Sequence, residues 1–531
     1  KARYKAINQK LSELSSRFQN NLLDATNAWS KLVTDESELA GIPDSAKSMF
    51  AQNAANKDKQ GWLVTLEFPS VQAVLTHADS RELRREVYEA FSTRASDQGP
   101  HAGQFDNGPL IEEILALRHE QANLVGFANY AEYSVATKMA EDTDKVMAFL
   151  EDLAKRARPA AQREFAELGE FAAESLGIDG LEAWDVNYAS EKLRQARYQL
   201  SQEDLRPYFS APKVIAGLFQ VVERLFGVSI EERQGVETWH ADVTFYDVLD
   251  AGGELVASFY LDPYAREHKR GGAWMDECTT RMRVGDELDK PVAYLVCNFT
   301  PPVDGKPALL THDEVTTLFH EAGHGFHHML TRIDYPAVSG INGVEWDAVE
   351  LPSQFLENWC WEREALDLFA RHHETGEPLP GDLFDKMIAA RNFQSAMFTV
   401  RQLEFALFDF RLHRDYDPAN PTPVMDVLSA VRAEVSVVVP PAFNRFPHAF
   451  GHIFAGGYAA GYYSYKWAEV LSADAFSAFE EAGVFDADTG ERFRREVLEV
   501  GGSRPAMESF KAFRGREPEL DALLRHTGIA A

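Results

Sequence analysis

The sequence predicts a mainly helical protein with one small β-sheet that directly precedes a metal-binding helix. Most of the chain has apolar residues at helical spacing, and strand-like patterns are concentrated between residues 243 and 299. Just after that stretch, residues 311–330 (THDEVTTLFHEAGHGFHHML) carry the H-E-x-x-H pattern. With 531 residues, 45% of them hydrophobic, the chain can bury a large core and form more than one structural unit.

The first two hundred or so residues predict a helical scaffold. Residues 1 to about 33 have the spacing of a long amphipathic helix that ends near Leu32. Alternation predicts a short strand at 62–68, and a stretch rich in Gly, Pro and Asn predicts a loop at 97–109. Further helices are expected at 83–91, 111–124, 138–176 and 213–226. Nothing in this region indicates a reaction, so we assign it a structural role as scaffold or lid.

The sequence opens inside a helical pattern. Lys1 is not an initiator methionine, and apolar residues recur at helical spacing between Ile7 and Phe18. We therefore expect a truncated or processed chain, whose upstream part could have held a signal peptide.

Strands dominate the middle of the chain. The β-rich segments 243–249 and 254–261 flank Ala251-Gly252-Gly253, which predicts a hairpin. After a Gly- and Arg-rich loop at 265–274, residues 292–299 (VAYLVCNF) predict another strand. This strand could bind an extended peptide by β-augmentation, or it could be an ordinary member of the sheet. The sequence favours neither alternative.

The last part of the chain is predicted to be helical again. A Gly-rich loop follows the metal helix, then comes DAVELPSQFLENWCWE at 347–362, and helices follow to the end with an interruption at 444–467. No repeat or Ser/Gly linker divides the chain. The predicted secondary structure changes from helical to β-rich near residue 236. We therefore expect a helical scaffold at 1–238 and a zinc-binding region with the sheet and C-terminal helices at 239–531.

Charge and cysteine content limit the partners and the compartment. Lys plus Arg number 53 and Asp plus Glu 83, which gives a net charge of −30 and argues against nucleic acid or an anionic membrane as partner. No apolar run is long enough to span a bilayer. Cys278, Cys297 and Cys360 are odd in number and lack C-x-x-C spacing, so neither a disulfide framework nor a cysteine zinc site is expected. We expect a cytoplasmic protein.

Residues 311–330 have the features of a buried, capped helix that carries metal ligands. Thr311 and Glu314 fit a capping box. His320 and His324 are four apart, so they share one face and their imidazoles can converge on one ion. Apolar residues at helical spacing supply a buried stripe: Val315, Leu318, Phe319, Ala322, Phe326, Met329 and Leu330.

Two candidates exist for the third protein ligand that a catalytic zinc ion needs. His327 lies on the same face, but its backbone is about 10 Å along the axis from His320, so three imidazoles of one straight helix would crowd one side of the ion. Glu350 lies in an apolar setting and precedes a proline, which fits an early turn of a second helix. We therefore expect His320, His324 and Glu350 to hold one Zn²⁺ per chain. The alternative for His327 and its neighbour His328 is that they lie beside the site or at the surface.

Glu321 is the predicted general base, because it points beside the ligand face, within reach of a metal-bound water. The alternative, a salt-bridged helix glutamate, fits poorly between two metal ligands. Gly323 costs about 1 kcal/mol against Ala in mid-helix, and it could allow close packing beside the ion. Glu357 and Asn358 lie two turns beyond Glu350, where they could orient a ligand imidazole or be ordinary polar residues.

A tyrosine-rich segment is the second informative stretch. Gly456 and Gly457 permit mobility or a close approach to a ligand. Phenol and imidazole donors that face the zinc would stabilise the oxyanion of a tetrahedral intermediate. The alternative is that these aromatic residues form a core stripe. The flexible glycines argue against it, and so does the need of buried hydroxyls for hydrogen-bond partners. The candidate donors are His452 and, at i, i+4 and i+7 on one expected helical face, Tyr458, Tyr462 and Tyr465.

Several motifs, in this order along the chain, resemble those of the thimet-oligopeptidase family of zinc metallopeptidases. The similarity runs along the whole sequence and includes STRASDQGP at 92–100 and KRGGAWMD at 269–276. The most specific motifs are HEAGHGFHHML, WDAVELPSQFLENWCWE, FPHAFGHIFAGGYAAGYYSYKW and FRGREP. Members of this family carry further N-terminal helical sequence, and many have Phe where this chain has Ala322.

The resemblance implies a two-lobed, zincin-like metallopeptidase with a deep channel that admits only short peptides to zinc at its floor. It implies His320, His324 and Glu350 as ligands and Glu321 as the catalytic residue. It also implies substrate contacts for His452, Tyr458, Tyr462 and Tyr465, with Tyr465 as the expected oxyanion donor. Because they permit a close approach to a ligand, Gly456 and Gly457 are also expected to bind substrate. The implied role is cytoplasmic clearance of short peptides, including cleaved signal peptides, and we expect a monomer.

The sequence thus predicts a zinc endopeptidase for short oligopeptides, with two alternatives. A peptidyl-dipeptidase would release C-terminal dipeptides, but no Arg or Lys that could bind the free carboxylate is identifiable from sequence. A non-catalytic peptide-binding protein with a structural metal would have no use for Glu321 as a base. Nitrogen and oxygen ligands also suit cobalt or manganese.

Overall fold

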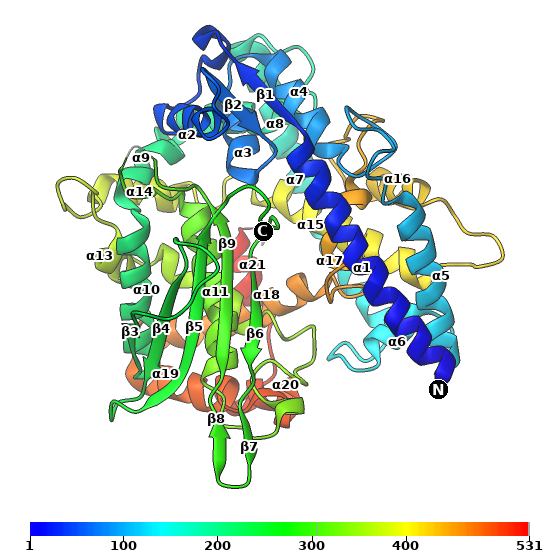
Figure 1. Cartoon of the computed structure of the whole chain (residues 1–531), viewed down its shortest axis with the longest axis vertical. Coiled ribbons are helices and arrows are strands. Elements are labelled where there is room, and N and C mark those ends of the chain that lie inside the picture. The colour runs from blue at the N-terminus through cyan, green and yellow to red at the C-terminus, as the bar shows by residue number, and fades with distance from the viewer. Residues whose placement is uncertain (304, 529–531) are drawn as a thin grey trace.

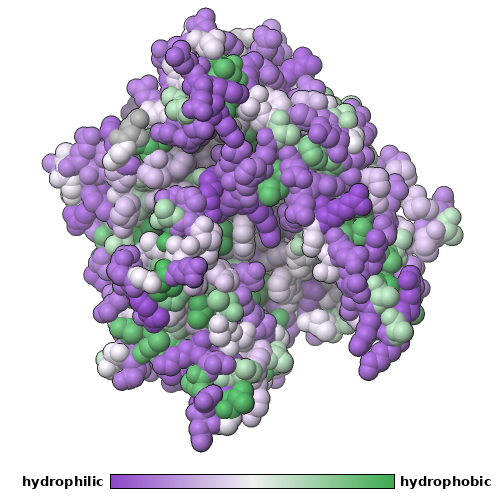
Figure 2. Space-filling model, in the orientation of Figure 1, coloured by the Kyte–Doolittle hydropathy of each residue, from purple (hydrophilic) through white to green (hydrophobic). Residues whose placement is uncertain are grey.

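Two lobes make up the molecule, each around its own apolar core (Figure 1). The computed structural model describes residues 1–303 and 305–528. The first lobe, here called the sheet lobe, contains a five-stranded sheet, the predicted metal helix α11 (His312–Met329) and the C-terminal helices. The second, the helical lobe, is built around α15 (Ser395–Arg414). Figure 2 shows a hollow between the parts of the surface that carry the sheet and α1. The mainly helical, two-lobed fold class is as predicted.

The five-stranded sheet has the order β3-β4-β5-β9-β6. The predicted hairpin is confirmed, since β4 and β5 pair antiparallel on either side of the Gly-Gly turn. β9 (Val292–Phe299) has the predicted bounds and lies inside the sheet, parallel to β5 and antiparallel to β6. Because both of its edges are paired, β9 cannot bind a peptide by β-augmentation, so the ordinary-strand alternative is correct. The other strands are β3 (Ser229–Glu232), β4 (Thr244–Leu249), β5 (Leu255–Tyr264) and β6 (Trp274–Thr279).

A small two-stranded sheet near the N-terminus corrects one prediction. α1 (Ala2–Ala28) ends before Leu32, which lies in β1 (Ser30–Val33). β1 pairs antiparallel with β2 (Trp62–Thr65), a partner some 30 residues away that local periodicity cannot reveal. The sequence also did not predict the short hairpin of β7 (Met282–Val284) and β8 (Glu287–Asp289).

The other N-terminal helices lie close to their predicted positions. α7 (Thr143–Leu176) begins five residues later than expected, because the carboxylate of Asp142 accepts from the Lys145 amide and caps it. The remaining helices before the sheet are α2 (Asp44–Ala55), α3 (Phe68–His77), α4 (Arg81–Ser92), α5 (Gly108–Leu124), α6 (Tyr130–Val135), α8 (Val186–Tyr198), α9 (Gln202–Leu205) and α10 (Ala211–Phe226).

The helices after α11 divide between the two lobes. α15 packs against α7 and α16, which come from either side of the predicted boundary at 238/239, so that division stays a prediction. The bounds are α12 (Leu351–Glu357), α13 (Arg363–Phe369), α14 (Gly381–Ala389), α16 (Val424–Val435), α17 (Gly451–Phe454), α18 (Ser464–Ala482), α19 (Ala487–Phe493), α20 (Ala506–Arg514) and α21 (Asp521–Thr527).

Two expectations from composition concern membranes and disulfides. No helix in the described part of the chain has the length and apolar character needed to cross a bilayer. The three cysteines are free thiols, with Cys297 and Cys360 buried in the sheet lobe.

Phe355 is an aromatic anchor of the sheet lobe, and its loss should destabilise the fold. Its ring stacks on Phe493 at 4.0 Å between centroids and packs against Trp359 at 4.8 Å. We expect Phe355→Ala to cost about 3–5 kcal/mol of unfolding free energy and to lower the thermal unfolding midpoint. Phe68→Ala, at an exposed ring, should change stability by less than about 0.5 kcal/mol. Equal effects of the two substitutions would contradict the assignment of Phe355 to the core.

Candidate metal centre

The metal helix begins with the predicted capping box. The hydroxyl of Thr311 accepts from the Glu314 amide at 3.1 Å, and the Glu314 carboxylate accepts from the Thr311 amide at 2.8 Å. The same carboxylate also accepts from the amide and hydroxyl of Thr300, just after β9. One side chain therefore fixes both the start of the helix and its position against the sheet.

His320, His324 and Glu350 form the cluster of possible metal ligands that the described residues contain. Their ligand atoms all lie within 4.8 Å of one another. The Nε2 atoms of His320 and His324 lie 3.2 and 3.0 Å from one carboxylate oxygen of Glu350. Burial alone would raise the pKa of Glu350, but the two imidazoles outweigh it and hold this pKa well below its ordinary value. Two nitrogens and an ionised carboxylate oxygen fit a catalytic zinc site.

Neighbouring side chains orient two of the three candidate ligands by hydrogen bonds. His320 donates through Nδ1 to Glu357 at 2.6 Å, which directs its Nε2 toward Glu350. The predicted orienting role therefore fits Glu357, whereas Asn358 donates to backbone carbonyls of its own helix. The hydroxyl of Ser353 donates to the carboxylate of Glu350, the third candidate ligand, at 2.9 Å.

Glu350 occupies the position that the sequence suggests, immediately before α12 with Pro352 in the first turn. His327 does not belong to the cluster, although it lies on the same helix. Both His327 and His328 are buried, so the surface alternative for them is wrong. His328 bonds the Thr279 carbonyl at 3.0 Å, while Nδ1 of His327 has no hydrogen-bond partner among the described residues.

Glu321 lies in the environment that a general base requires. Its side chain is buried, and one carboxylate oxygen has no hydrogen-bond partner within the part of the chain that the structure describes. Burial, with a smaller effect from Glu350, raises its pKa above the ordinary value. A carboxylate with a raised pKa and a free oxygen can accept a proton and later release it.

Gly323 allows the two metal-bearing helices to touch. A Cβ atom at this position would overlap with the backbone of Pro352 and Ser353 in α12. The glycine therefore fits the close packing that the sequence suggests, and this contact brings Glu350 up to the two imidazoles.

The tyrosine segment is not the single helical face that its spacing suggests. α17 ends at Phe454 and α18 begins at Ser464, so Tyr458 and Tyr462 lie in the non-helical segment between them. Gly457 allows a close approach to Trp346, since a Cβ there would lie 2.6 Å from the indole ring, whereas at Gly456 it would lie 2.9 Å from the His452 carbonyl.

The aromatic rings of this segment nevertheless gather beside the ligands. The ring centroid of Tyr465 lies 4.9 Å from that of Tyr458, 5.0 Å from that of Tyr462 and 6.2 Å from that of His452. Tyr458 donates its hydroxyl proton to Glu350, whereas Tyr462 donates to Gln402 at 3.0 Å and so faces away from the ligands. Burial raises the pKa of Tyr458 and Tyr465 well above the ordinary value, which keeps both phenols protonated as donors.

Two buried aspartates that sequence reasoning missed hold this segment. Asp409, on α15, accepts from the backbone amides of Ala460, Gly461 and Tyr462 at 2.8, 2.9 and 2.9 Å. Asp347 accepts from the Tyr463 hydroxyl at 2.9 Å and from the amides of residues 139 and 140. An acidic residue inside an otherwise apolar helix pattern is the sequence signal that could have revealed Asp409.

A match to a protein-family model shows which family the chain belongs to. The model of peptidase family M3 matches residues 74–529. The chain belongs to peptidase family M3. This M3 protein is therefore a peptidase, and both the family and the enzyme class predicted from sequence are confirmed.

Curated relatives agree with this membership. The M3 chain is 58% identical to oligopeptidase A of Salmonella typhimurium and of Escherichia coli, over 99% of its own length and 78% of theirs. It is 34% identical to a dipeptidyl carboxypeptidase of Salmonella typhimurium, over 100% of its length and 77% of that protein. A solved structure described as PZ peptidase A with inhibitor 2 shares the fold, with a TM-score of 0.60 at 16% identity, over 99% of this chain and 75% of that one.

Gly323→Ala tests the contact between the metal-bearing helices. The added methyl group would push α12 away from α11 and move Glu350 from His320 and His324. We expect zinc affinity to fall at least tenfold in a chelator titration, although Ala favours a helix by about 1 kcal/mol over Gly. Gly169→Ala is the matched control, because a Cβ there meets no atom within 4 Å and should leave zinc affinity unchanged. Unchanged affinity in Gly323→Ala would show that the contact is not needed.

Asp409→Asn tests whether Asp409 positions the tyrosines. The amide group would place N–H donors against backbone amides that now donate to a carboxylate, so the 460–462 turn should shift. We expect kcat to fall roughly tenfold to a hundredfold, with a much smaller change in KM and in zinc content.

Asp474→Asn serves as the control for that measurement. Asp474 is equally buried and bonds Arg514 and Arg516, but it lies away from the metal centre. We expect it to lower the unfolding midpoint without the selective loss of kcat. The same loss of kcat in both variants would show that Asp409 only stabilises the fold and does not position the tyrosines.

Proposed function

We propose that this M3 peptidase is a zinc-dependent oligopeptidase that hydrolyses internal bonds of short peptides. The prediction of an oligopeptidase agrees with the 58% identity to two bacterial oligopeptidases A and with the 48% identity to an organellar oligopeptidase A of Arabidopsis thaliana. The observation that carries the proposed mechanism is the convergence of His320, His324 and Glu350, with the buried base Glu321 between the two histidines.

His320, His324 and Glu350 would hold one Zn²⁺ and leave a position for water and substrate. When bound, the ion would polarise the scissile carbonyl and lower the pKa of water to about 7. Glu321 accepts the proton of the attacking water and then gives it to the leaving amine, which its raised pKa assists. Glu357 keeps the His320 ring in the required orientation.

The aromatic cluster supplies donors for the developing oxyanion. Tyr465 is the proposed main donor, since its ring packs beside those of Tyr458 and His452 and the charges of Glu350 and Glu321 act on its hydroxyl. Burial lowers the pKa of His452, so this imidazole is neutral at pH 7 and offers one N–H. Each such donor is worth about 10²–10³ in rate. Tyr462, Gly456 and Gly457 complete the proposed substrate-binding surface.

The substrates proposed are short peptides, including cleaved signal peptides. We propose that the hollow between the lobes (Figure 2) admits only extended, unfolded chains, as in the deep channel that the family resemblance implies. We further propose that the protein is a monomer and that it is cytoplasmic. The buried free thiols suit the reducing conditions of that compartment. Zinc rather than cobalt or manganese is the proposed ion, since it is the usual one for an H-E-x-x-H site.

Sequence identity supports the peptidyl-dipeptidase alternative less than the oligopeptidase. Identity to the dipeptidyl carboxypeptidase is 34%, against 58% to oligopeptidase A. Cleavage of a peptide with a blocked C-terminus, mapped by product masses, distinguishes the two: an endopeptidase cuts it, and a strict dipeptidase does not. The non-catalytic alternative is excluded by membership of a peptidase family together with the intact base.

Glu321→Gln tests the assignment of the base. The amide is isosteric but cannot accept the proton, so cleavage of a short peptide should fall at least a thousandfold while zinc content stays at one per chain. Metal analysis and a peptide assay measure the two quantities on one sample. Glu113→Gln, at an exposed position on α5, should change neither. Retained turnover in Glu321→Gln would remove Glu321 from this role.

A further inference from the structure

The backbone between Tyr458 and Tyr462 contains a residue in a strained conformation. Ala460 has a φ of +46°, in the left-handed region that residues with a Cβ atom rarely adopt, and its side chain is fully buried. A backbone of this kind persists only where its surroundings hold it. Asp409 holds the amides of residues 460–462, but a carboxylate can only accept. The carbonyl oxygens of the same turn need a donor from elsewhere.

Ser134, on α6, supplies this donor from the other side of the turn. Its hydroxyl donates to the carbonyl oxygens of Ala459 at 3.1 Å and of Ala460 at 3.0 Å. The turn, here defined as residues 459–462, is therefore held through its amides by α15 and through its carbonyls by α6. Ser134 lies more than 320 positions before the turn in sequence, so only the folded chain brings the two together.

Lys138, four residues after Ser134, fixes the direction of this hydroxyl. Its ammonium group donates to the Ser134 hydroxyl oxygen at 2.8 Å and also to the Ser134 backbone carbonyl. Because an ammonium group cannot accept a hydrogen bond, the hydroxyl hydrogen of Ser134 must point away from it, toward the turn. A charged donor also polarises the hydroxyl and so strengthens the bond that the hydroxyl itself donates.

Lys138 also places a positive charge near both buried aspartates of this region. Burial lowers its pKa to about 8, and the charges of Asp347 and Asp409 oppose that fall. In the described part of the chain, neither aspartate has a lysine or arginine nitrogen within 4 Å. Asp409 lies 3.1 Å from Nδ1 of His413, and Arg118 reaches that imidazole at 3.0 Å. Lys138 is therefore a counter-charge for Asp347 as well as for Asp409.

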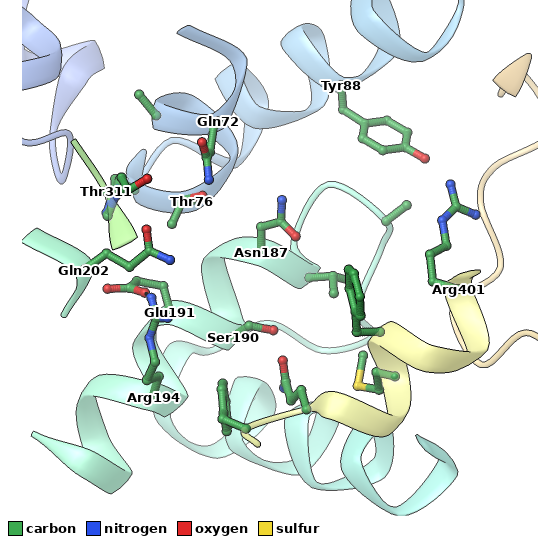
Figure 3. Close-up of a pocket in the computed structure, with 18 of the residues that line it drawn as sticks. Gln72, Thr76, Tyr88, Asn187, Ser190, Glu191, Arg194, Gln202, Thr311 and Arg401 are labelled. Atoms are coloured by element: carbon green, nitrogen blue, oxygen red, sulfur yellow. Dashed lines mark hydrogen bonds and ion pairs between the residues drawn. The ribbon is translucent and has the colours of Figure 1, made fainter. Parts of the chain in front are cut away.

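Carboxylates around a separate cavity show the more usual arrangement, in which each one pairs directly with an arginine (Figure 3). The volume of this cavity is about 520 Å³, and its walls include parts of α3, α8 and α15. The pairs are Glu191 with Arg194, Glu203 with Arg206 at 2.9 Å, and Glu404 with Arg401 at 2.7 Å. Behind the turn the counter-charge instead acts at longer range, so a neutral side chain at position 138 would leave both aspartates less compensated.

We propose that Ser134 and Lys138 are positioning residues for the peptidase reaction, because they hold the turn that lies between Tyr458 and Tyr465. The inference rests on the proposed function and adds two residues to it. Both act on the backbone that presents the proposed oxyanion donors. Their loss should therefore weaken binding of the tetrahedral transition state more than binding of the peptide itself.

Ser134→Ala in the zinc-loaded enzyme is the first test, because it removes the two contacts with the turn. We expect kcat for a short peptide to fall about tenfold and KM to change less than about twofold. A phosphinic peptide, which places a tetrahedral phosphorus at the cleaved bond, should bind about tenfold more weakly in calorimetry, in proportion to kcat/KM. Ser134→Thr keeps the hydroxyl and should recover most of the lost rate.

Lys138→Met is the second test, since it removes the charge and keeps most of the side-chain volume. We expect kcat to fall by a similar factor. The double variant with Ser134→Ala should lose little more than the larger single loss, because both residues act through one hydroxyl. Fully additive losses would show two independent structural effects and would overturn the joint role.

Two matched substitutions are the controls. Ser477→Ala removes a hydroxyl that donates to the Ala473 carbonyl within α18, and Lys213→Met removes an ammonium group that donates to the His372 carbonyl. Both should leave kcat and the affinity for the phosphinic peptide unchanged. Unchanged kcat in Ser134→Ala, or a fall in kcat without weaker binding of the phosphinic peptide, would overturn the inference and leave the proposed function intact. Failure of the wild-type enzyme to cleave the peptide would instead contradict the proposed function itself.

Discussion

The close contact between α11 and α12 is the constraint on which the site depends. One helix carries both imidazoles and the proposed base, and the carboxylate of Glu350 comes from the residue just before the other helix. These helices can approach only because Gly323 has no side chain where α12 passes. The capping box at Thr311 and the contact of Glu314 with Thr300 fix the axial position of α11 against the sheet. The ligand geometry is thus set by packing before any ion binds.

The two lobes are joined at the reaction centre by polar contacts. Asp409 belongs to a helix of the helical lobe, and it holds the turn that presents Tyr458 and Tyr462. Asp347 lies just before Glu350 in sequence and bonds both the 139–140 segment and Tyr463. These two buried carboxylates therefore link the turn that carries the proposed oxyanion donors to α15 and to the segment that leads to Glu350.

Local patterns predicted the parts of the structure that local interactions decide. The cap and length of α11, the bounds of β9 and the Gly-Gly hairpin follow from periodicity and turn chemistry. Glu350 could be chosen over His327 because a helix geometry argument excludes the crowded alternative. The end of α1, the turns around Tyr458 and the interior position of β9 depend on partners far away in sequence, such as β2, Asp409 and β6. Gln402 carries no motif, so only the folded structure brings it to the Tyr462 hydroxyl.

The strong acidity of the chain has a consequence for encounter kinetics. A net charge of −30 produces a negative potential around the molecule that extends about one Debye length, roughly 8 Å at physiological ionic strength. Diffusing peptides rich in lysine or arginine are attracted by this field, and acidic peptides are repelled, before either reaches the active site. Capture is therefore biased by the overall charge of a peptide. Added salt reduces this bias, because it shortens the distance over which the potential acts.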